Sequence, residues 1–145
     1  MLLAFVSFSQ KQFTLTELLQ LNLLSTEQLT VELKSNGFGQ VENSNDTFIR
    51  VLGFTNQQKQ VISKAFLPNS TSSLTLHTPS PFPLEAFKKQ LDSSGFALFN
   101  KNHLKGTYME MYRKEKTTIT ITFPDDTEEG KILAFYLIAI VTPTK

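Results

Sequence analysis

The stretch LKSNGFGQV at residues 33–41 returns as LDSSGFALF at residues 91–99. Both copies place Gly four residues after Leu and follow it with Phe. Gly reaches the left-handed backbone conformation at less cost than other residues, and a residue in that conformation commonly ends a helix. If Gly37 and Gly95 lie just beyond helices, the preceding Leu and the following Phe occupy the two positions that touch in a Schellman ending. The repeated stretch therefore predicts two helices that each turn directly into a strand.

The sequence around the first copy predicts two helices followed by strands. Thr14 and Glu17 have the spacing of a capping box, and a second helix should run from about Thr26 to Ser35. After Phe38 the chain should contain a short extended stretch and a polar turn at 42–46. Three strands are then expected, at 47–54, 56–67 and 72–79.

The sequence around the second copy repeats this order. Ser80 and Pro81 suit the start of a helix, because Pro is tolerated in the first helical turn. Polar turns are expected at 100–106 and 124–130. The expected strands cover 97–99, 107–114, 117–123 and 131–143. Each half also ends in Thr-Pro, at 78–79 and at 142–143, which supports an internal repeat.

We therefore expect an α+β fold in which two helix–β–β–β(–β) pseudo-repeats, at residues 12–79 and 80–145, form one antiparallel sheet with the helices packed on one face. The two units should make a single domain over 12–145, because one hairpin with one helix is marginal by itself. The run Ile132–Val141 is apolar on both strand faces, which favours a central strand over an edge strand. The stretch PDDTEEG at 124–130 should form a charged hairpin turn.

The composition excludes several classes of protein. The chain has 145 residues, of which 40% are hydrophobic and 19% charged, as is typical of a globular domain. Its 14 Lys and Arg residues nearly balance 13 Asp and Glu residues, so a general electrostatic footprint for nucleic acid is absent. The chain has no Cys, which excludes disulfides, thiolate catalysis and thiolate-bound metal clusters.

The chain begins with MLLAFVSFSQKQ, an apolar run followed by small and then polar residues. Ser7 and Ser9 have the small-x-small spacing of a signal-peptidase site. We therefore interpret residues 1–9 as the remnant of a signal peptide, which predicts a periplasmic or secreted protein. The alternative is that residues 2–8 form an edge strand. The run is too short to span a membrane.

The sequence offers no catalytic or metal-binding constellation. His77 and His103 are the only His residues, and neither has a partner at the spacing of a metal site, so both are expected in turns or on the surface. The carboxylates of 124–130 depart from the order of a calcium loop, and no P-loop, dinucleotide or nucleophile-elbow motif occurs. One basic stretch, YRKEK at 112–116, lies in a chain without a net positive field. We expect no catalytic residue, no bound metal, no cofactor and no nucleic-acid partner.

A candidate binding surface comes from the alternation in the second unit. If Ile119, Ile121 and Phe123 face the helices, the Thr residues between and before them face away. The Tyr residues of the neighbouring strand share one face, and Tyr supplies contact area at low entropic cost. We expect a recognition surface on the uncovered sheet face, formed by Tyr108, Tyr112, Thr118, Thr120 and Thr122. The alternative is a solvated face whose residues reflect strand propensity alone.

The whole pattern resembles a known group of proteins. A signal-like start, FTLTELLQL at 13–21, a helix that ends in Gly-Phe at 37–38, β-hairpins and a second Gly-Phe ending at 95–96 are similar to secreted and periplasmic proteins of Gram-negative bacteria with tandem helix–Gly-Phe–β-hairpin units. The layout more distantly resembles β-lactamase-inhibitor-like domains, which usually carry disulfides. The resemblance implies an envelope or extracellular setting and transfers no catalytic motif.

Three hypotheses for the function remain. The first is a non-catalytic binding or interaction domain of the bacterial envelope or exterior, with an unknown protein or small ligand as its partner. It predicts an open aromatic sheet face and no deep polar pocket. The second is a small-ligand carrier with an apolar cavity lined by Phe. The third is a small carboxylate-based hydrolase, which needs a concave pocket with two acids.

Overall fold

The computed structural model describes residues 10–45, 49–68 and 70–143, with the backbone alone at 42–45. The helices of this part of the chain are α1 (Leu15–Leu23), α2 (Thr26–Ser35), α3 (Leu84–Ser93) and α4 (Glu128–Leu133). Its strands are β1 (Gly39–Asn45), β2 (Arg50–Thr55), β3 (Val61–Leu67), β4 (Thr71–Pro79), β5 (Ala97–Leu104), β6 (Thr107–Lys114), β7 (Thr117–Pro124) and β8 (Phe135–Pro143).

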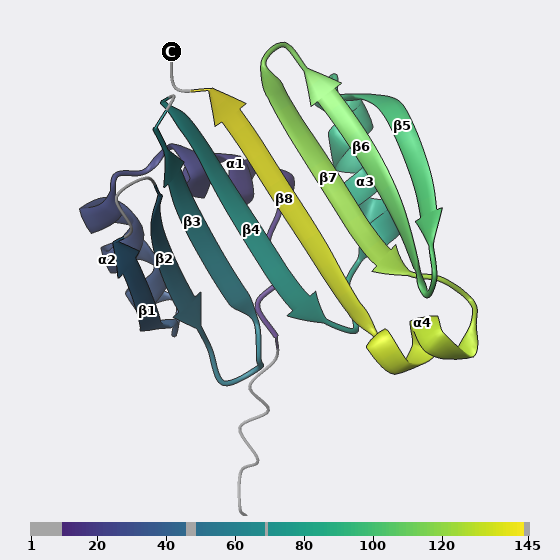
Figure 1. Ribbon diagram of the computed structural model, residues 1–145, viewed down its shortest axis with the longest axis horizontal. Coiled ribbons are helices and arrows are strands. Elements are labelled where there is room, and N and C mark those ends of the chain that lie inside the picture. Colours follow the sequence, from purple (N-terminus) through teal and green to yellow (C-terminus); the bar gives the residue numbers. More distant parts are fainter. Residues whose placement is uncertain (1–9, 46–48, 69, 144–145) are drawn as a thin grey trace, which may run out of the picture.

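The strands form one antiparallel sheet in the order β1-β2-β3-β4-β8-β7-β6-β5. Each unit contributes four strands that follow one another across the sheet, and the last strands of the two units, β4 and β8, lie side by side in the middle (Figure 1). The expected α+β fold with two helix–strand pseudo-repeats is confirmed. The central place of β8 also agrees with its apolar residues on both faces.

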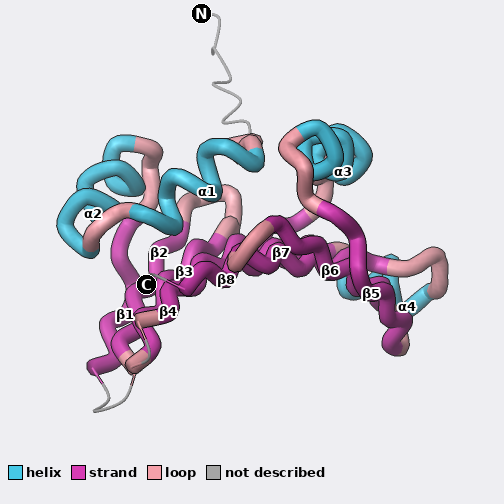
Figure 2. Tube along the Cα trace, turned by 90° about the horizontal axis from the view of Figure 1, so that it is seen from above, coloured by secondary structure: helices cyan, strands magenta, loops and turns pink. Residues whose placement is uncertain are grey.

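Helices α1, α2 and α3 lie on one side of the sheet, α2 over the first unit, α1 over the central β4–β8 pair and α3 over the second unit (Figure 2). The hydrophobic core fills the space between them and the sheet. It contains fully buried side chains from both units, among them Leu18, Leu33, Phe54, Leu76, Phe87, Leu91, Ile119 and Ile140. The short α4 connects β7 to β8 at one end of the sheet (Figure 1).

Both Gly-Phe stretches end helices in the expected way. Gly37 has φ +84° and Gly95 has φ +83°. After α2 the N–H of Phe38 donates to the carbonyl of Leu33 at 2.9 Å, and the N–H of Gly37 donates to that of Lys34 at 3.1 Å. After α3 the corresponding bonds run from Phe96 and Gly95 to Leu91 and Asp92, both at 3.0 Å. These are the two hydrogen bonds of a Schellman motif, so the prediction drawn from the repeat is confirmed.

The helix starts are confirmed for the first unit and differ in the second. Thr14 forms a full capping box with Glu17, and Ser25 forms one with Gln28. In the second unit the helix begins at Leu84 rather than at Ser80 and Pro81, with Pro83 as N-cap and no side-chain cap in the described chain. The residues at 80–83 instead lead the chain from the end of β4 to the helix layer.

Two polar stretches that we expected to be turns belong to strands. Strand β1 continues through 42–45, and β5 continues through 100–104. Both are edge strands, and every residue of β5 is exposed. A strand that is exposed on both faces loses the alternation of a half-buried strand, so its polar sequence looks like a turn.

The charged stretch 124–130 is not a hairpin turn. Thr127 accepts a hydrogen bond from the N–H of Gly130 at 3.2 Å and caps α4. Ile132 and Leu133 therefore lie in α4 and not in a strand, and the Ile132 side chain is 80% exposed. The strand β8 begins only at Phe135, after Ala134 has adopted a left-handed conformation at φ +41°.

The interpretation of residues 1–9 as a signal-peptide remnant lies outside the described residues. The described chain starts at Gln10, whose side-chain amide donates to Thr78 Oγ1 at 2.6 Å and to the Pro79 carbonyl at 3.0 Å. None of the helices in the described part of the chain is long and apolar enough to cross a membrane.

The helix endings give the first prediction. Gly37→Ala and Gly95→Ala should each lower the free energy of unfolding by about 1–2 kcal/mol, because a Cβ is strained in the left-handed conformation. No neighbour lies closer than 3.8 Å to the added Cβ at either position, so crowding contributes little. Urea unfolding measures the change. The control is Gly39→Ala, which has open space and no positive φ and should change stability by less than about 0.5 kcal/mol. Equal effects at all three positions would contradict the assignment.

Candidate functional site

Among the described residues no helix covers the side of the sheet opposite α1–α3, and we call this side the open face (Figure 2). Directly paired residues of neighbouring strands point to the same side of a sheet, so the register assigns each side chain to a face. Thr118, Thr120 and Thr122 pair with residues of β8 that point away from the buried Ile138 and Ile140. The structure therefore places the three predicted Thr residues on the open face, where all are partly exposed.

The two predicted Tyr residues lie on the other face. Tyr108 pairs with Phe123, and Tyr112 pairs with the buried Ile119. Tyr112 is only 8% exposed and packs in the core. The expectation that Tyr and Thr share the uncovered face was wrong, because the turn at Glu115 between β6 and β7 sets even-numbered residues of β6 opposite odd-numbered residues of β7.

The open face is uncharged across five adjacent strands. In place of Tyr, β6 presents Met109 and Met111 opposite Thr122 and Thr120. The five strands next to it, β7, β8, β4, β3 and β2, are all described, and their open-face positions hold no Asp, Glu, Lys or Arg. These positions are Thr118, Thr120, Thr122, Phe135, Leu137, Ala139, Val141, Pro143, Thr71, Ser73, Thr75, His77, Pro79, Val61, Ser63, Ala65, Leu67, Val51, Gly53 and Thr55.

The border of this uncharged area is marked by two aromatic contacts. His77 stacks on Phe135 with ring centroids 4.9 Å apart, at the end of β4. Arg113 of β6 lies over the Phe99 ring, 4.3 Å from its centroid. It pairs with Thr118 of β7, so this charged side chain lies on the open face just beyond the uncharged strands. The assignment of β4 and β8 to one continuous face required the strand order.

Glu110 ties β6 to α3 on the helix-covered side. Its carboxylate accepts a hydrogen bond from Tyr112 Oη at 2.6 Å, and Lys88 Nζ lies at 3.1 Å. Burial works to raise the pKa of Glu110, but the hydrogen bonds from Tyr112 and Lys88 and the charges of Lys88 and Lys101 outweigh it and leave the pKa below its usual value. Burial and the bond to Glu110 raise the pKa of Tyr112. The cluster therefore joins an ionised Glu110 to the neutral Tyr112 hydroxyl and to the Lys88 ammonium.

His103 and Asp125 form a pair that no motif in the sequence predicted. His103 Nε2 lies 2.8 Å from Asp125 Oδ2, although the residues are 22 positions apart. The His103 ring is stacked on Tyr108 at 4.4 Å, and its side chain is 54% exposed, whereas that of Asp125 is 2% exposed. Hydrogen bonds from Thr127 and His103 lower the pKa of Asp125 to about 2.

A His oriented by a buried carboxylate is one part of a general-base site. The hollows on α1 and α2 do not include His103 or Asp125 in their linings. The described residues also contain no group of three His, Asp or Glu side chains that could hold a metal ion. Since Asp125 also receives the Thr127 N–H at 2.9 Å, the pair mainly joins the β5–β6 hairpin to the start of α4.

Lys64 is a fully buried cation at the carboxyl end of α1. Its ammonium donates to the backbone carbonyl of Asn22 and, at 3.0 Å, to Asn22 Oδ1, which Ser72 also contacts at 3.2 Å. The last carbonyls of a helix carry partial negative charge and favour a cation there. Burial nevertheless lowers the pKa of Lys64 to about 8. Lys64 is sealed from solvent, which excludes it as an accessible nucleophile.

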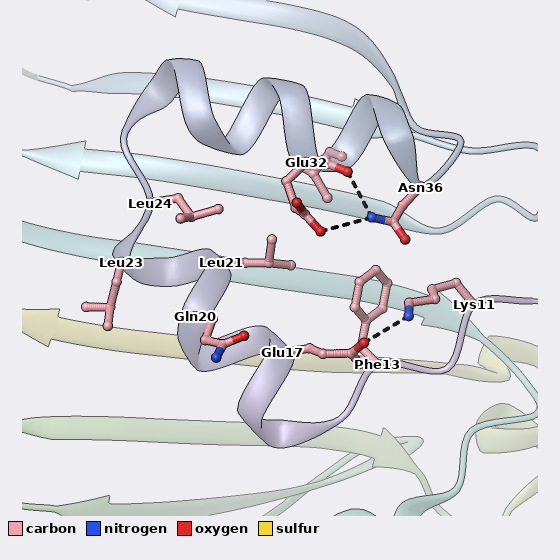
Figure 3. A pocket seen from close by; sticks show the side chains of 10 residues that line it. Lys11, Phe13, Glu17, Gln20, Leu21, Leu23, Leu24, Glu32 and Asn36 are labelled. Carbon is pink, nitrogen blue, oxygen red and sulfur yellow. Dashed lines mark hydrogen bonds and ion pairs between the residues drawn. The ribbon is translucent and has the colours of Figure 1, made fainter.

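A groove lies between α1 and α2, on the side away from the open face (Figure 3). It has a volume of about 410 Å³ and is half open to solvent. Its apolar lining comes from both helices and the segment before α1, with Phe13, Leu21, Leu24 and Leu33. Its rim carries the ion pair of Lys11 and Glu17 at 2.9 Å and the Asn36–Glu32 contact (Figure 3).

Comparisons of the chain with family models, with curated proteins and with solved structures found no match.

The depressed pKa of Asp125 predicts a pH-dependent contribution to stability. Its folded pKa of about 2 lies below the ordinary 3.8, so the contribution is complete above about pH 4 and disappears as the pH falls through 2. Asp125→Asn should lower the urea midpoint at pH 7, and the deficit should shrink between pH 4 and pH 2. The control is Asp126→Asn at the exposed neighbouring position. Equal urea midpoints for the two variants at every pH would contradict a stabilising role of the Asp125 carboxylate.

The lowered pKa of Lys64 predicts a change in stability at alkaline pH. Because its folded pKa of about 8 lies below the ordinary 10.5, the unfolded chain binds more protons between these values, and stability should rise with pH there. Over this pH range the free energy of unfolding of the wild type should rise by on the order of 2–3 kcal/mol more than that of Lys64→Met. Lys34→Met, at an exposed position of α2, is the control and should keep the wild-type pH dependence. Urea unfolding at several pH values measures both, and a parallel profile for Lys64→Met contradicts the prediction.

Proposed function

We propose that the protein is a non-catalytic interaction domain of the bacterial envelope or exterior, periplasmic or secreted, which binds a protein partner through its open face. The observation that carries this proposal is the uncharged area over five adjacent strands. The signal-like residues 1–9 support a periplasmic or secreted location.

The chemistry of the open face suits a protein interface. The cores of interfaces are depleted in charged residues, because a charge that loses water without a partner is costly. Thr and Ser hydroxyls can exchange bonds to water for bonds to a partner, and Met109 and Met111 adapt to irregular surfaces. Wide uncharged surfaces with apolar side chains commonly mark interaction sites. Thr118, Thr120 and Thr122 stay part of the proposed surface. Tyr108 and Tyr112 point to the other side of the sheet.

The two alternative functions receive less support. A carrier needs an enclosed apolar cavity, but the Phe38, Phe54 and Phe87 side chains pack into the core and the groove between α1 and α2 is half open. A carboxylate-based hydrolase needs a general acid with a raised pKa. The described carboxyl groups with shifted pKa values, Glu17, Glu110 and Asp125, are all shifted downward.

The proposal is tested by placing a charge on the open face. Thr120→Glu and, separately, Thr75→Glu put a carboxylate on either side of Ala139. The control, Thr16→Glu, adds the same charge at an exposed position of α1. Wild-type and variant proteins are immobilised and incubated with envelope and secreted fractions of the source organism, and bound proteins are quantified by mass spectrometry.

We expect a partner that wild type and Thr16→Glu retain and that both open-face variants lose by about tenfold or more, which corresponds to about 1.4 kcal/mol. Circular dichroism and urea unfolding verify that the variants remain folded. Equal recovery of the partner with all four proteins would contradict the open-face proposal.

A further inference from the structure

The helix-covered side has a second surface with the features of an interface. Helices α1 and α2 are joined by only Leu24 and Ser25, so they form a hairpin, and Asn36 at the end of α2 lies across the groove from Lys11 before α1 (Figure 3). An adjoining hollow shares Leu24 and Glu32 with the first and extends it along α2 to Val31. We call the two together the α1–α2 groove.

Apolar side chains project along this groove instead of packing into the core. The Leu23 side chain is 74% exposed and the Val31 side chain 69% exposed. Both line the groove, next to the partly buried Leu24. Apolar tips that rim an apolar hollow indicate a binding surface more strongly than single exposed residues do.

The charges around the groove are predominantly acidic. Of the described residues, Glu17, Glu27 and Glu32 line it together with one cation, Lys11. Lys11 is paired with Glu17 at 2.9 Å, so Glu27 and Glu32 set the sign of the remaining field. Complementary charge selects a partner with cations beside its apolar contacts.

We propose that the α1–α2 groove binds a basic amphipathic helix of a partner protein. A third helix fits the depression between α1 and α2, and its apolar stripe would contact the Leu and Val side chains while Lys or Arg on its flanks meet the Glu residues. At 1.5 Å per residue the nine residues of α1 span about 14 Å, which matches apolar contacts at i, i+3 or i+4, and i+7. The groove lies across the sheet from the open face, so this interface is separate from the proposed function.

A second copy of this chain is a poorer occupant. In a symmetric dimer the same patch contacts itself. The Glu27 and Glu32 carboxylates of one copy would then face those of the other, and like charges across an interface are repulsive.

The probe is a fluorescent synthetic peptide of about 15 residues, with Leu at the i, i+3, i+4, i+7 positions of a helix and Lys elsewhere. Two matched peptides accompany it. One has Glu in place of Lys, and the other has the same composition in scrambled order. Fluorescence anisotropy measures binding to the full chain. We expect the Leu/Lys helix to bind at least about tenfold more tightly than either matched peptide and to weaken as salt is raised.

The groove variant is Val31→Lys, which replaces an exposed apolar tip with a cation and leaves the core intact. Its matched control is Ile132→Lys on α4, because Ile132 is also an exposed apolar helix residue, at 80% exposure, and belongs to the other unit. Val31→Lys should weaken binding by about tenfold, and Ile132→Lys should leave it unchanged. Glu27→Gln combined with Glu32→Gln should reduce the salt dependence.

The proposal is overturned if the Leu/Lys peptide binds no better than its matched peptides, or if Val31→Lys and Ile132→Lys bind it equally. Sedimentation identifies the competing occupant. A wild-type dimer that Val31→Lys dissociates would assign the groove to a second copy and also overturn the proposal.

Discussion

The pairing of β4 with β8 is the interaction on which the rest of the structure depends. It runs over nine residue pairs, from Thr71–Pro143 to Pro79–Phe135, and joins the last strands of the two units. Without it β4 and β8 would both be unpaired edge strands, β8 with apolar residues on both faces, and the two units would share no sheet. This pairing also explains the repeated Thr-Pro. Pro79 and Pro143 are the last residues of β4 and β8, where the missing N–H of Pro costs the fewest ladder hydrogen bonds.

A buried polar chain beneath α1 connects the units across this central pair. Asn22 Oδ1 of α1 accepts hydrogen bonds from Lys64 of β3 and Ser72 of β4, and the Asn22 amide nitrogen donates to Thr142 of β8 at 3.3 Å. Thr142 lies 3.1 Å from Thr117 of β7. Every buried side-chain nitrogen and oxygen of the described residues has a partner. A satisfied polar network of this kind permits one alignment of helix and strands, since a shift would leave several buried groups unpaired.

The two proposed interfaces follow from what this arrangement leaves uncovered. Three helices cover one side of an eight-stranded sheet, so Thr, Ser, Met and aliphatic side chains on the opposite side remain in contact with solvent. The hairpin of α1 and α2 buries its inner apolar residues against the sheet and leaves Leu23 and Val31 exposed. One surface is uncharged and the other acidic, which suits them to partners of different chemistry.

The sequence by itself determined the local features of the fold. The helix endings at Gly37 and Gly95 and the caps at Thr14 and Ser25 depend on backbone preferences that act within a few residues. The face of Tyr112 and the pairing of His103 with Asp125 were decided only by the tertiary structure. So were the polar edge strands and the α1–α2 groove, which depend on which elements become neighbours. The physical reason is that burial and charge pairing depend on strand order and register, and a one-residue change in register exchanges the two faces of a strand without altering any local signal.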